Sequence, residues 1–304
     1  MSSPAIPNIL SIDLEDWHQL VHRRLTQAAG LPSANVDRQI EVLLALLDEH
    51  KVKATFFTLG MLAETRPEVV RRVAASGHEI ASHGYAHRRV YQMSLEDFRA
   101  DAAKGKALLE GITGEKVRGY RAAEFSITRP ALWALEVLAE LGFEYDSSIF
   151  PIHHRRYGIA DFDPRPARYK FADGRSLVEV PLATQRRAGQ NVPFSGGGYF
   201  RLLPLSALVR GFERVNATGL PVTTYFHPYE FDPEPLDAFA GLERPSLGQR
   251  ITGMRLNWHQ NLGRNSLRGK LAELLRRFRF TTFREYLERA DLGESRTLSL
   301  AADR

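Results

Sequence analysis

Two histidines separated by three residues are the first pattern in this sequence that could do chemistry. They are His83 and His87, in the segment HEIASHGYAH. An i, i+4 pair lies on one face of a helical turn, so both imidazoles can hold the same cation. Three acids, Asp13, Glu15 and Asp16, follow the apolar run ILSI near the N-terminus. One of them could complete a metal site that keeps an open position for water.

Each half of this pattern also has an ordinary structural interpretation. The chain has ten histidines, so a pair at this spacing can arise by chance in a core or on a surface. The acids alone could be the N-cap and first-turn residues of a helix. Together they favour the metal site, because clustered carboxylates at the end of a buried strand are costly unless a cation or a function holds them.

The elements that must position these residues alternate along the chain. Apolar runs predict strands at 9–13, 54–59, 79–82, 117–121, 177–181, 222–226 and 280–283. Helical spacing, capping residues and proline positions predict helices at 36–49, 66–75, from Ser94 onward and at 130–141. Strands that alternate with helices indicate an α/β fold with a mostly parallel sheet or barrel.

Polar residues follow these strands repeatedly. Asp13 follows the first strand, His83 follows 79–82, Arg121 ends 117–121, and His227 follows 222–226. Asp146 lies just beyond the helix at 130–141. Ligands of parallel α/β folds bind at the carboxyl ends of the strands, so we expect these residues to meet at one end of the sheet.

Composition restricts the protein class further. The 304 residues are 43% hydrophobic and 25% charged, which is typical of a globular protein and excludes a disordered or fibrous chain. There are no cysteines, so a metal must sit on His, Asp or Glu. With no secretory signal and no apolar run near 20 residues, the expected location is cytoplasmic, with the inner membrane face left open. The net charge of +5 gathers late, on an amphipathic pattern at 264–279 that we interpret as a solvated basic helix.

Five segments, taken together, resemble a known family. They are SIDLEDWHQ, HEIASHGYAH, GYRAAEFSIT, YDSSIFP and YFHPYEFDP. The chain resembles the polysaccharide deacetylases of carbohydrate esterase family 4, and most of all the branch found with exopolysaccharide and protein-sorting loci. The resemblance implies the NodB-homology fold, a distorted (β/α)7-type barrel. The expected organisation is one catalytic domain over 1–304, with a core of about 7–231 and a C-terminal extension at 232–291.

The resemblance also implies hydrolysis of N-acetyl groups on an acetylamino sugar, with a divalent metal, expected to be zinc, held as Asp-His-His. His83 and His87 match the two histidine ligands. The family pattern has two adjacent aspartates, the first a base and the second a ligand, whereas this chain has two residues inserted after Asp13. We expect Asp16 to be the carboxylate ligand, with Glu15 as the alternative.

The remaining catalytic roles follow from the same resemblance. Asp13 is expected to be the general base, and Arg121 to orient it. His227 is expected to protonate the leaving amine, with Asp146 or another acid orienting His227. A backbone N–H near Tyr145 is expected to help hold the oxyanion. Arg121 could instead be a salt-bridge partner, His227 a hydrogen-bonded core residue and Asp146 a turn residue.

Substrate contacts are expected from Tyr145, Trp17, Gly197 and Tyr199, with a carbohydrate as partner and no nucleic acid. Trp17 could equally fill the core, and Gly197 belongs to a glycine run that we place at the barrel mouth. The oligomeric state is left open.

Three other functions compete with this hypothesis. A hydrolase of cyclic amides or imides from the same superfamily would share the barrel and vary the first motif. A non-enzymatic binder of anionic polymers would use the basic C-terminal helix and leave the five motifs unexplained. A degenerate deacetylase kept for carbohydrate binding is disfavoured by the complete histidine pair.

Overall fold

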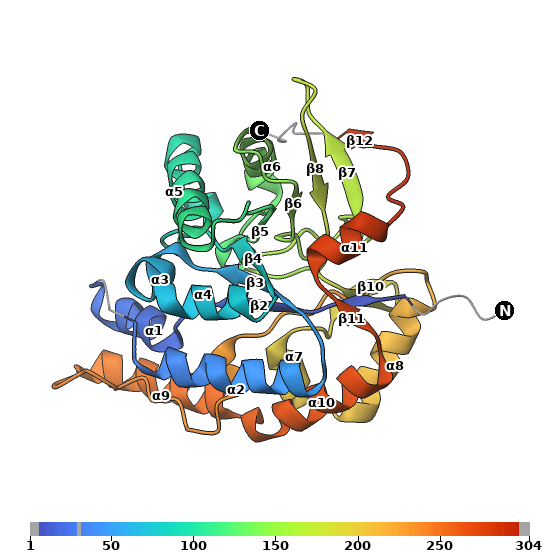
Figure 1. Ribbon diagram of the computed structural model, residues 1–304. Coiled ribbons are helices and arrows are strands. Elements are labelled where there is room, and N and C mark those ends of the chain that lie inside the picture. The colour runs from blue at the N-terminus through green and yellow to red at the C-terminus, as the bar shows by residue number, and fades with distance from the viewer. Residues whose placement is uncertain (1–5, 29–31, 298–304) are drawn as a thin grey trace.

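A curved sheet of short strands forms the centre of the molecule (Figure 1). The computed structural model describes residues 6–28 and 32–297. The main sheet has eight strands in the order β12-β7-β8-β6-β5-β4-β3-β2. Their bounds are β2 (Ser11–Leu14), β3 (Thr55–Thr58), β4 (Glu79–Ser82), β5 (Gly119–Tyr120), β6 (Tyr145–Asp146), β7 (Ala167–Lys170), β8 (Ser176–Glu179) and β12 (Arg296–Thr297). All neighbours pair in parallel except β7 and β8, which are antiparallel.

The sheet continues past β2 and curves into an incomplete barrel. Residues 222–226 run parallel to β1 (Asn8–Ile9) and β2, although only isolated bridges form there. The bridges are Ile9–Thr223, Ile12–Phe226 and Gly196–Tyr225. The segment at Ser195 and Gly196, which pairs with Tyr225, also reaches the chain that follows β8. There the Ser195 hydroxyl donates to the Ala183 carbonyl at 3.1 Å. The predicted α/β barrel with a mostly parallel sheet is therefore confirmed.

Helices cover the outside of this barrel (Figure 1). They are α1 (Trp17–Thr26), α2 (Asn35–Glu49), α3 (Gly60–Thr65), α4 (Pro67–Ala75), α5 (Leu95–Thr113), α6 (Trp133–Glu140), α7 (Gly197–Leu202), α8 (Leu205–Asn216), α9 (Leu247–Asn261), α10 (Leu267–Arg277) and α11 (Phe283–Arg289). Short 3-10 turns are η1 (Val90–Gln92), η2 (Ala123–Phe125), η3 (Arg129–Ala131), η4 (Pro228–Glu230) and η5 (Arg264–Ser266). Two small sheets lie outside the main one. One is the hairpin of β9 (Thr184–Arg187) and β10 (Gln190–Pro193), and the other pairs β1 with β11 (Phe280–Thr281). No described helix combines the length and the apolar character that a membrane crossing requires.

Local sequence signals account for several of these elements. Strand β4 has the predicted bounds, and α2 buries Ile40, Leu43 and Leu47 as its spacing predicts. Helix α5 starts where expected, because the Ser94 side chain accepts a hydrogen bond from the Asp97 N–H at 3.1 Å. Proline at the first position of α4 fits the helical φ and lacks only an N–H that would be unpaired there.

The C-terminal segment is part of the same domain. Helix α10 buries its four leucines in the main hydrophobic cluster, and its arginines Arg276 and Arg277 pair with Glu273. Strand β11 pairs in parallel with β1, so the two ends of the chain share a sheet. The division into a core and an extension near residue 231 stays a prediction.

Candidate metal centre and active site

The candidate residues gather at the carboxyl ends of adjacent strands. Asp13 lies in β2, and Glu15 follows directly after it. His83 follows β4, and Arg121 follows β5. His227 follows the extended segment 222–226 and is the N-cap residue of η4. Strand pairing brings these positions together although Asp13 and His227 lie more than two hundred residues apart in sequence.

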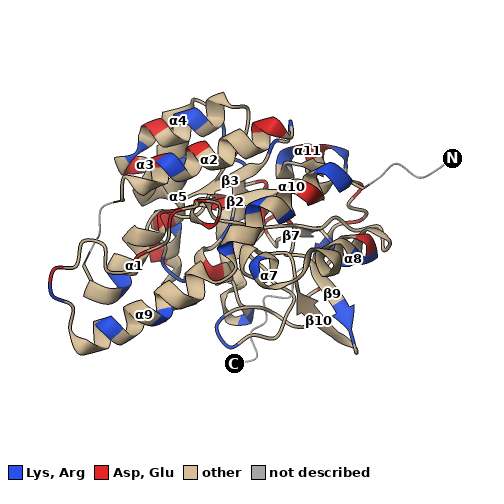
Figure 2. Ribbon diagram, turned by 90° about the horizontal axis from the view of Figure 1, so that it is seen from below, with Lys and Arg blue, Asp and Glu red and all other residues tan. Residues whose placement is uncertain are grey.

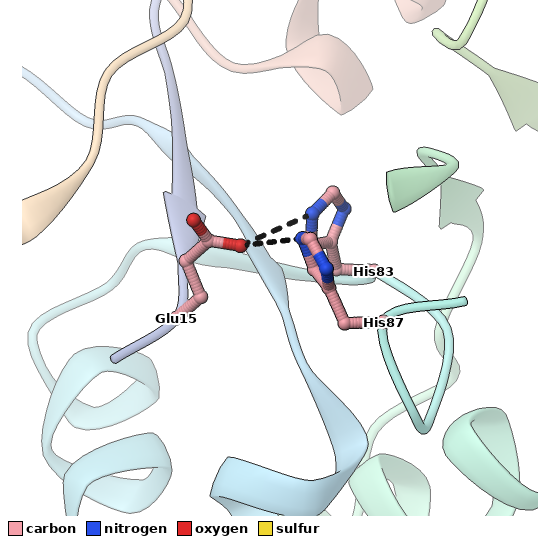
Figure 3. Close-up of side chains that lie close together, drawn as sticks. All are labelled: Glu15, His83 and His87. Atoms are coloured by element: carbon pink, nitrogen blue, oxygen red, sulfur yellow. Dashed lines mark ion pairs between the residues drawn. The ribbon is translucent and has the colours of Figure 1, made fainter. Parts of the chain in front are cut away.

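Glu15, His83 and His87 form a compact cluster (Figure 3). The Glu15 Oε2 atom lies 2.9 Å from His87 Nε2 and 3.7 Å from His83 Nε2. One ligand atom from each of the three residues lies within 4.8 Å of the others. Oε2 is buried and makes no hydrogen bond of regular geometry. Two imidazole nitrogens and a carboxylate oxygen at this separation fit a divalent metal such as zinc.

The charges in this cluster are strongly coupled. Burial alone would raise the pKa of Glu15, but His87, His83 and His227 together hold it well below its usual value. Burial would likewise lower the pKa of His87, but the Glu15 carboxylate outweighs it and raises that pKa. The cluster therefore holds an ionised carboxylate in a buried position, which is the state that a cation ligand requires.

Asp16, the carboxylate ligand expected from the sequence, has a different position. Its side chain caps α1 by accepting a hydrogen bond from the His18 N–H at 3.0 Å, and it also accepts one from the Ser33 N–H. These bonds turn the carboxylate toward the start of the helix. The geometry thus favours Glu15, the alternative that the sequence left open.

The loop that carries the histidines is not the helical turn that their spacing suggested. Residues 83–89 form an irregular segment, with φ of +72° at Gly84 and +50° at His87. Asp101 of α5 holds this loop by accepting hydrogen bonds from the Tyr85 N–H at 2.7 Å and the Ala86 N–H at 3.1 Å. The left-handed residues reverse the chain, so both imidazoles still reach Glu15.

His83 is also fixed from its other side. Its Nδ1 lies 2.9 Å from the Arg121 carbonyl oxygen. Because a carbonyl only accepts, Nδ1 donates this hydrogen bond, and Nε2 is the ring nitrogen that faces Glu15. A second hydrogen bond of this kind is typical of histidines that ligate metals.

Arg121 anchors the predicted base. Its guanidinium is fully buried and donates to Asp13 Oδ1 at 2.7 Å and to the Ser11 hydroxyl at 2.8 Å. It also donates to the Ser147 carbonyl and hydroxyl, and it lies 4.0 Å from the centre of the Phe57 ring. This network fixes the Asp13 carboxylate in one orientation beside the cluster.

His227 is oriented by Glu230 rather than by Asp146. The His227 Nε2 atom lies 3.5 Å from Glu15 Oε1, and its Nδ1 lies 3.2 Å from Glu230 Oε2. Burial would lower the pKa of His227, but Glu230, Glu15 and Asp13 raise it to about 9. The imidazole can therefore carry a proton at neutral pH and present it beside the cluster. The spacing of three residues between His227 and Glu230 was the available sequence signal, since one 3-10 turn joins them.

Asp146, which the sequence placed behind His227, has other partners. It accepts hydrogen bonds from the Ser148 N–H at 2.9 Å and the Ser148 hydroxyl at 2.7 Å. In the sheet it lies opposite Glu179, which sequence reasoning did not single out. Burial and the Asp146 charge raise the pKa of Glu179 well above its usual value, so this pair shares a proton. The positive charge of Arg121 acts on both acids in the opposite direction to burial and lowers the pKa of each.

The four predicted substrate contacts are distributed unevenly. Tyr145 points away from the cluster, because its hydroxyl donates to Glu79 and its backbone N–H donates to Arg118. Trp17 is 4% exposed and packs on Tyr229, yet it lines the cleft described below. Tyr199 is half-buried and Gly197 is buried beside Glu230, so Gly197 supports the site from behind.

A cleft of about 680 Å³ opens beside the cluster. Glu15 and His87 line it together with the aromatic side chains of Trp17 and Tyr229. Its arginines are Arg23, Arg24, Arg88, Arg89 and Arg156. Glu124 pairs with two of them, Arg89 at 3.0 Å and Arg156 at 3.7 Å. The excess of positive charge favours a substrate that carries anionic groups.

Gly197 offers a direct test of how the site is packed. A Cβ on Gly197 would lie 2.0 Å from Glu230 Oε2, whereas one on Gly198 would have its nearest neighbour at 3.7 Å. We expect Gly197→Ala to lower stability by about 1–3 kcal/mol, because overpacking displaces a buried side chain. Gly198→Ala should be neutral or stabilising by up to about 1 kcal/mol, as alanine favours the helix. Thermal unfolding of both variants measures this, and equal effects would contradict the packing described.

Glu230 offers a test of the electrostatics. We expect Glu230→Gln to lower the pKa of His227 from about 9 toward 6.5, because the neutral amide removes the largest interaction that raises it. Titration of the His227 imidazole signals by NMR measures the shift. Glu234→Gln is the control, since Glu234 is exposed and pairs with Arg38. An unchanged His227 pKa in Glu230→Gln would show that Glu230 does not hold the proton there.

Two family models match consecutive parts of the chain. The model described as polysaccharide deacetylase matches residues 35–145, which include His83, His87 and Arg121. A domain of unknown function, DUF3473, matches residues 147–288, which include His227 and Glu230.

Curated relatives are similar over shorter stretches. A chitooligosaccharide deacetylase from Rhizobium leguminosarum bv. trifolii is 51% identical over 145 residues, which cover 47% of this chain and 59% of that protein. A peptidoglycan deacetylase from Helicobacter pylori is 34% identical over 143 residues, or 46% of this chain and 43% of that protein. A peptidoglycan-N-acetylglucosamine deacetylase from Bacillus cereus is 35% identical over 95 residues, covering 31% and 34%. The chain thus spans about a third to three-fifths of the length of these relatives.

Solved structures share the fold over nearly the whole chain. A Mycobacterium smegmatis protein assigned to the polysaccharide deacetylases superposes with a TM-score of 0.60 at 22% identity, covering 98% of this chain and 96% of that one. Puue allantoinase superposes with a TM-score of 0.56 at 17% identity, covering 94% and 93%. At these identities the likeness establishes the fold.

Proposed function

The chain belongs to the polysaccharide deacetylase family, and from this premise we propose that it removes N-acetyl groups from an acetylamino sugar in a polysaccharide or its precursor by metal-dependent hydrolysis. One observation carries the proposal. A buried carboxylate and two imidazoles converge within 4.8 Å, beside the Asp13–Arg121 pair and the His227–Glu230 pair. Metal-dependent amide hydrolysis uses this combination of a site for a Lewis-acid metal, a general base and a general acid.

In this mechanism Glu15, His83 and His87 would hold the metal, which we propose to be zinc. A divalent metal in such a site supplies Lewis acidity to the amide carbonyl and to the attacking water. Zinc fits because it accepts imidazole nitrogen and carboxylate oxygen together and tolerates an open position. The histidine orientation set by the Arg121 carbonyl supports this assignment.

Asp13 acts as the general base in the proposed reaction. Arg121 occupies Oδ1, which leaves Oδ2 to take the proton from the attacking water. His227 then donates a proton from Nε2 to the leaving amine nitrogen, while Glu230 holds Nδ1. The raised pKa of His227 supports this role, since the acid must be protonated before the carbon–nitrogen bond breaks.

The substrate class follows from the family and from the cleft. We propose an acetylamino-sugar polymer of the exopolysaccharide type or its precursor. The open cleft supports a polymer, and its arginines support one that also bears anionic groups.

Acetate release tests this proposal directly. Purified protein with added zinc is incubated with N-acetylglucosamine oligomers and, separately, with a cyclic imide. We expect acetate from the oligomers, with one amine formed per acetate. Ring opening of the imide without any acetate from sugars would replace the proposal with a small-molecule amidohydrolase. If the protein turns over none of the oligomers, the imide and an acidic acetylamino-sugar polymer, the proposal is contradicted.

A further inference from the structure

Helix α9 presents its apolar side chains outward. Leu247 is 75% exposed, Trp258 68%, Met254 58% and Ile251 52%. Leu262, at the C-cap of the helix, is 44% exposed. Among the described residues, the other exposed large hydrophobic side chains are Leu202 at 63% and Leu95 at 37%, so solvent-facing apolar surface is concentrated on one helix. Such a contiguous apolar surface marks an interaction site.

The spacing places these side chains on one face. Positions 247, 251, 254 and 258 follow the i, i+4, i+7, i+11 pattern of a single helical stripe. We call these four residues the α9 stripe. The opposite face holds the helix on the protein. Gly253 packs so closely on the Phe239 ring that a Cβ would lie 2.5 Å from it, and the Gln249 side chain donates to the Leu25 carbonyl at 3.0 Å. The α9 stripe is therefore the solvent-facing side of a helix whose opposite side packs on the protein.

The charges on α9 are all positive. The helix contains Arg250 and Arg255, both exposed, and no acidic residue (Figure 2). At 100° per residue, these two arginines lie on opposite sides of the α9 stripe. Long basic side chains that flank an apolar face can extend to phosphate groups while the apolar face enters the acyl boundary. Trp258 adds the aromatic side chain that favours a membrane–water interface.

We propose that the α9 stripe docks this protein on an anionic lipid bilayer. A second copy of the chain fits the stripe poorly. Packing two such helices face to face, in either direction, would set the flanking arginines of one copy against those of the other. Phosphate-bearing lipid headgroups complement both flanks at once.

This docking would bring the catalytic cleft close to the membrane, on the other side of α9 from the stripe and about one helix diameter away. Helix α9 contacts α1 and lies beside it in Figure 1. Leu256 and Gln260 of α9 line the same cleft as Glu15 and His87. Acetylamino sugars attached to a lipid or lying along the membrane would then reach the site without release into solution. The docking itself rests on the surface of α9 and does not require the proposed catalytic activity.

Vesicle flotation tests the proposal. The full chain is mixed with vesicles of phosphatidylcholine alone or of phosphatidylcholine with phosphatidylglycerol. We expect binding to the anionic vesicles, a drop in bound fraction of about tenfold or more in the double variant Ile251→Gln/Trp258→Gln, and a weaker drop in Arg250→Gln/Arg255→Gln. Leu95→Gln is the control, because Leu95 is a large exposed hydrophobic residue on α5.

Three outcomes would overturn the proposal. One is an absence of binding to anionic vesicles, and another is equal binding by wild type and Ile251→Gln/Trp258→Gln. The third is a wild-type dimer in sedimentation velocity that the double variant converts to a monomer, which would make the stripe a self-association surface. Because the substituted side chains point to solvent, we expect unchanged thermal unfolding and unchanged acetate release from soluble oligomers. A failure of docking is therefore distinguishable from a failure of catalysis.

Discussion

Replacing His227 by glutamine should lower the rate of acetate release by roughly 10²–10⁴-fold, the usual contribution of a positioned general acid. Glutamine keeps a polar side chain next to Glu230 but cannot donate a proton to the leaving amine. His154→Gln is the matched control, because His154 is exposed and lies outside the cleft lining. A His227→Gln enzyme with the wild-type rate would exclude His227 as the acid.

The pH dependence provides a second measurement of the same residue. His227 must be protonated to act, and its pKa is raised to about 9, so wild-type turnover should fall as pH rises through about 9. The free energy of unfolding should change with pH in the same direction as the turnover rate. A histidine whose folded pKa exceeds its ordinary 6.5 adds stability that is complete below 6.5 and is lost as pH rises toward 9. Thermal unfolding from pH 6 to about 10 should show this loss in wild type and a smaller one in His227→Gln.

Replacing Arg121 by methionine should cost about 3–5 kcal/mol of unfolding free energy, because it leaves the buried Asp13 carboxylate without its partner. Methionine keeps an unbranched apolar stem but lacks the guanidinium that stacks on the Phe57 ring, so the loss reports the charge, its hydrogen bonds and the space that the guanidinium leaves. Arg118→Met is the control three residues earlier. Arg118 pairs with Glu144 on the surface at 3.3 Å, and such pairs contribute about 1 kcal/mol or less.

Urea unfolding measures both free energies. Equal losses in the two variants would show that the Arg121 network contributes no more than a surface ion pair. We expect Arg121→Met to lose acetate release as well, since Asp13 would no longer be held in one orientation.

Much of the barrel could be predicted because its signals are local. The EIAS strand, the leucine spacing of α2 and the serine cap of α5 each depend on a few adjacent residues. The segment 222–226 was expected as a strand, and it runs along β1 and β2, although only isolated bridges form. The placement of polar residues after strands then predicted which end of the barrel would carry the site.

The side-chain partners could not be predicted in the same way. Whether Glu15 or Asp16 faces the histidines depends on where α1 begins, and the Asp16 cap decides it. The histidine loop depends on Asp101, which is supplied by a separate helix. Glu230 replaces Asp146 behind His227 because one 3-10 turn folds it back, whereas Asp146 is held by Ser148.

The sequence pattern also could not predict that the apolar face of α9 is exposed to solvent. An apolar stripe at helical spacing usually faces a core, and α10 follows that rule with its four leucines. In α9 the same spacing faces solvent, because Gly253 and Gln249 make the contacts with the protein. Only the tertiary structure distinguishes these two cases.

Metal content, measured together with acetate release in the same preparations, tests whether Glu15, His83 and His87 hold a catalytic metal. We compare wild type with His83→Ala, Glu15→Gln and Asp16→Asn, since asparagine still caps a helix well. We expect about one metal per chain in wild type and Asp16→Asn, and the loss of both metal and acetate release in the other two variants. No metal in wild type after zinc is added, or full metal retention by Glu15→Gln and His83→Ala, would contradict it.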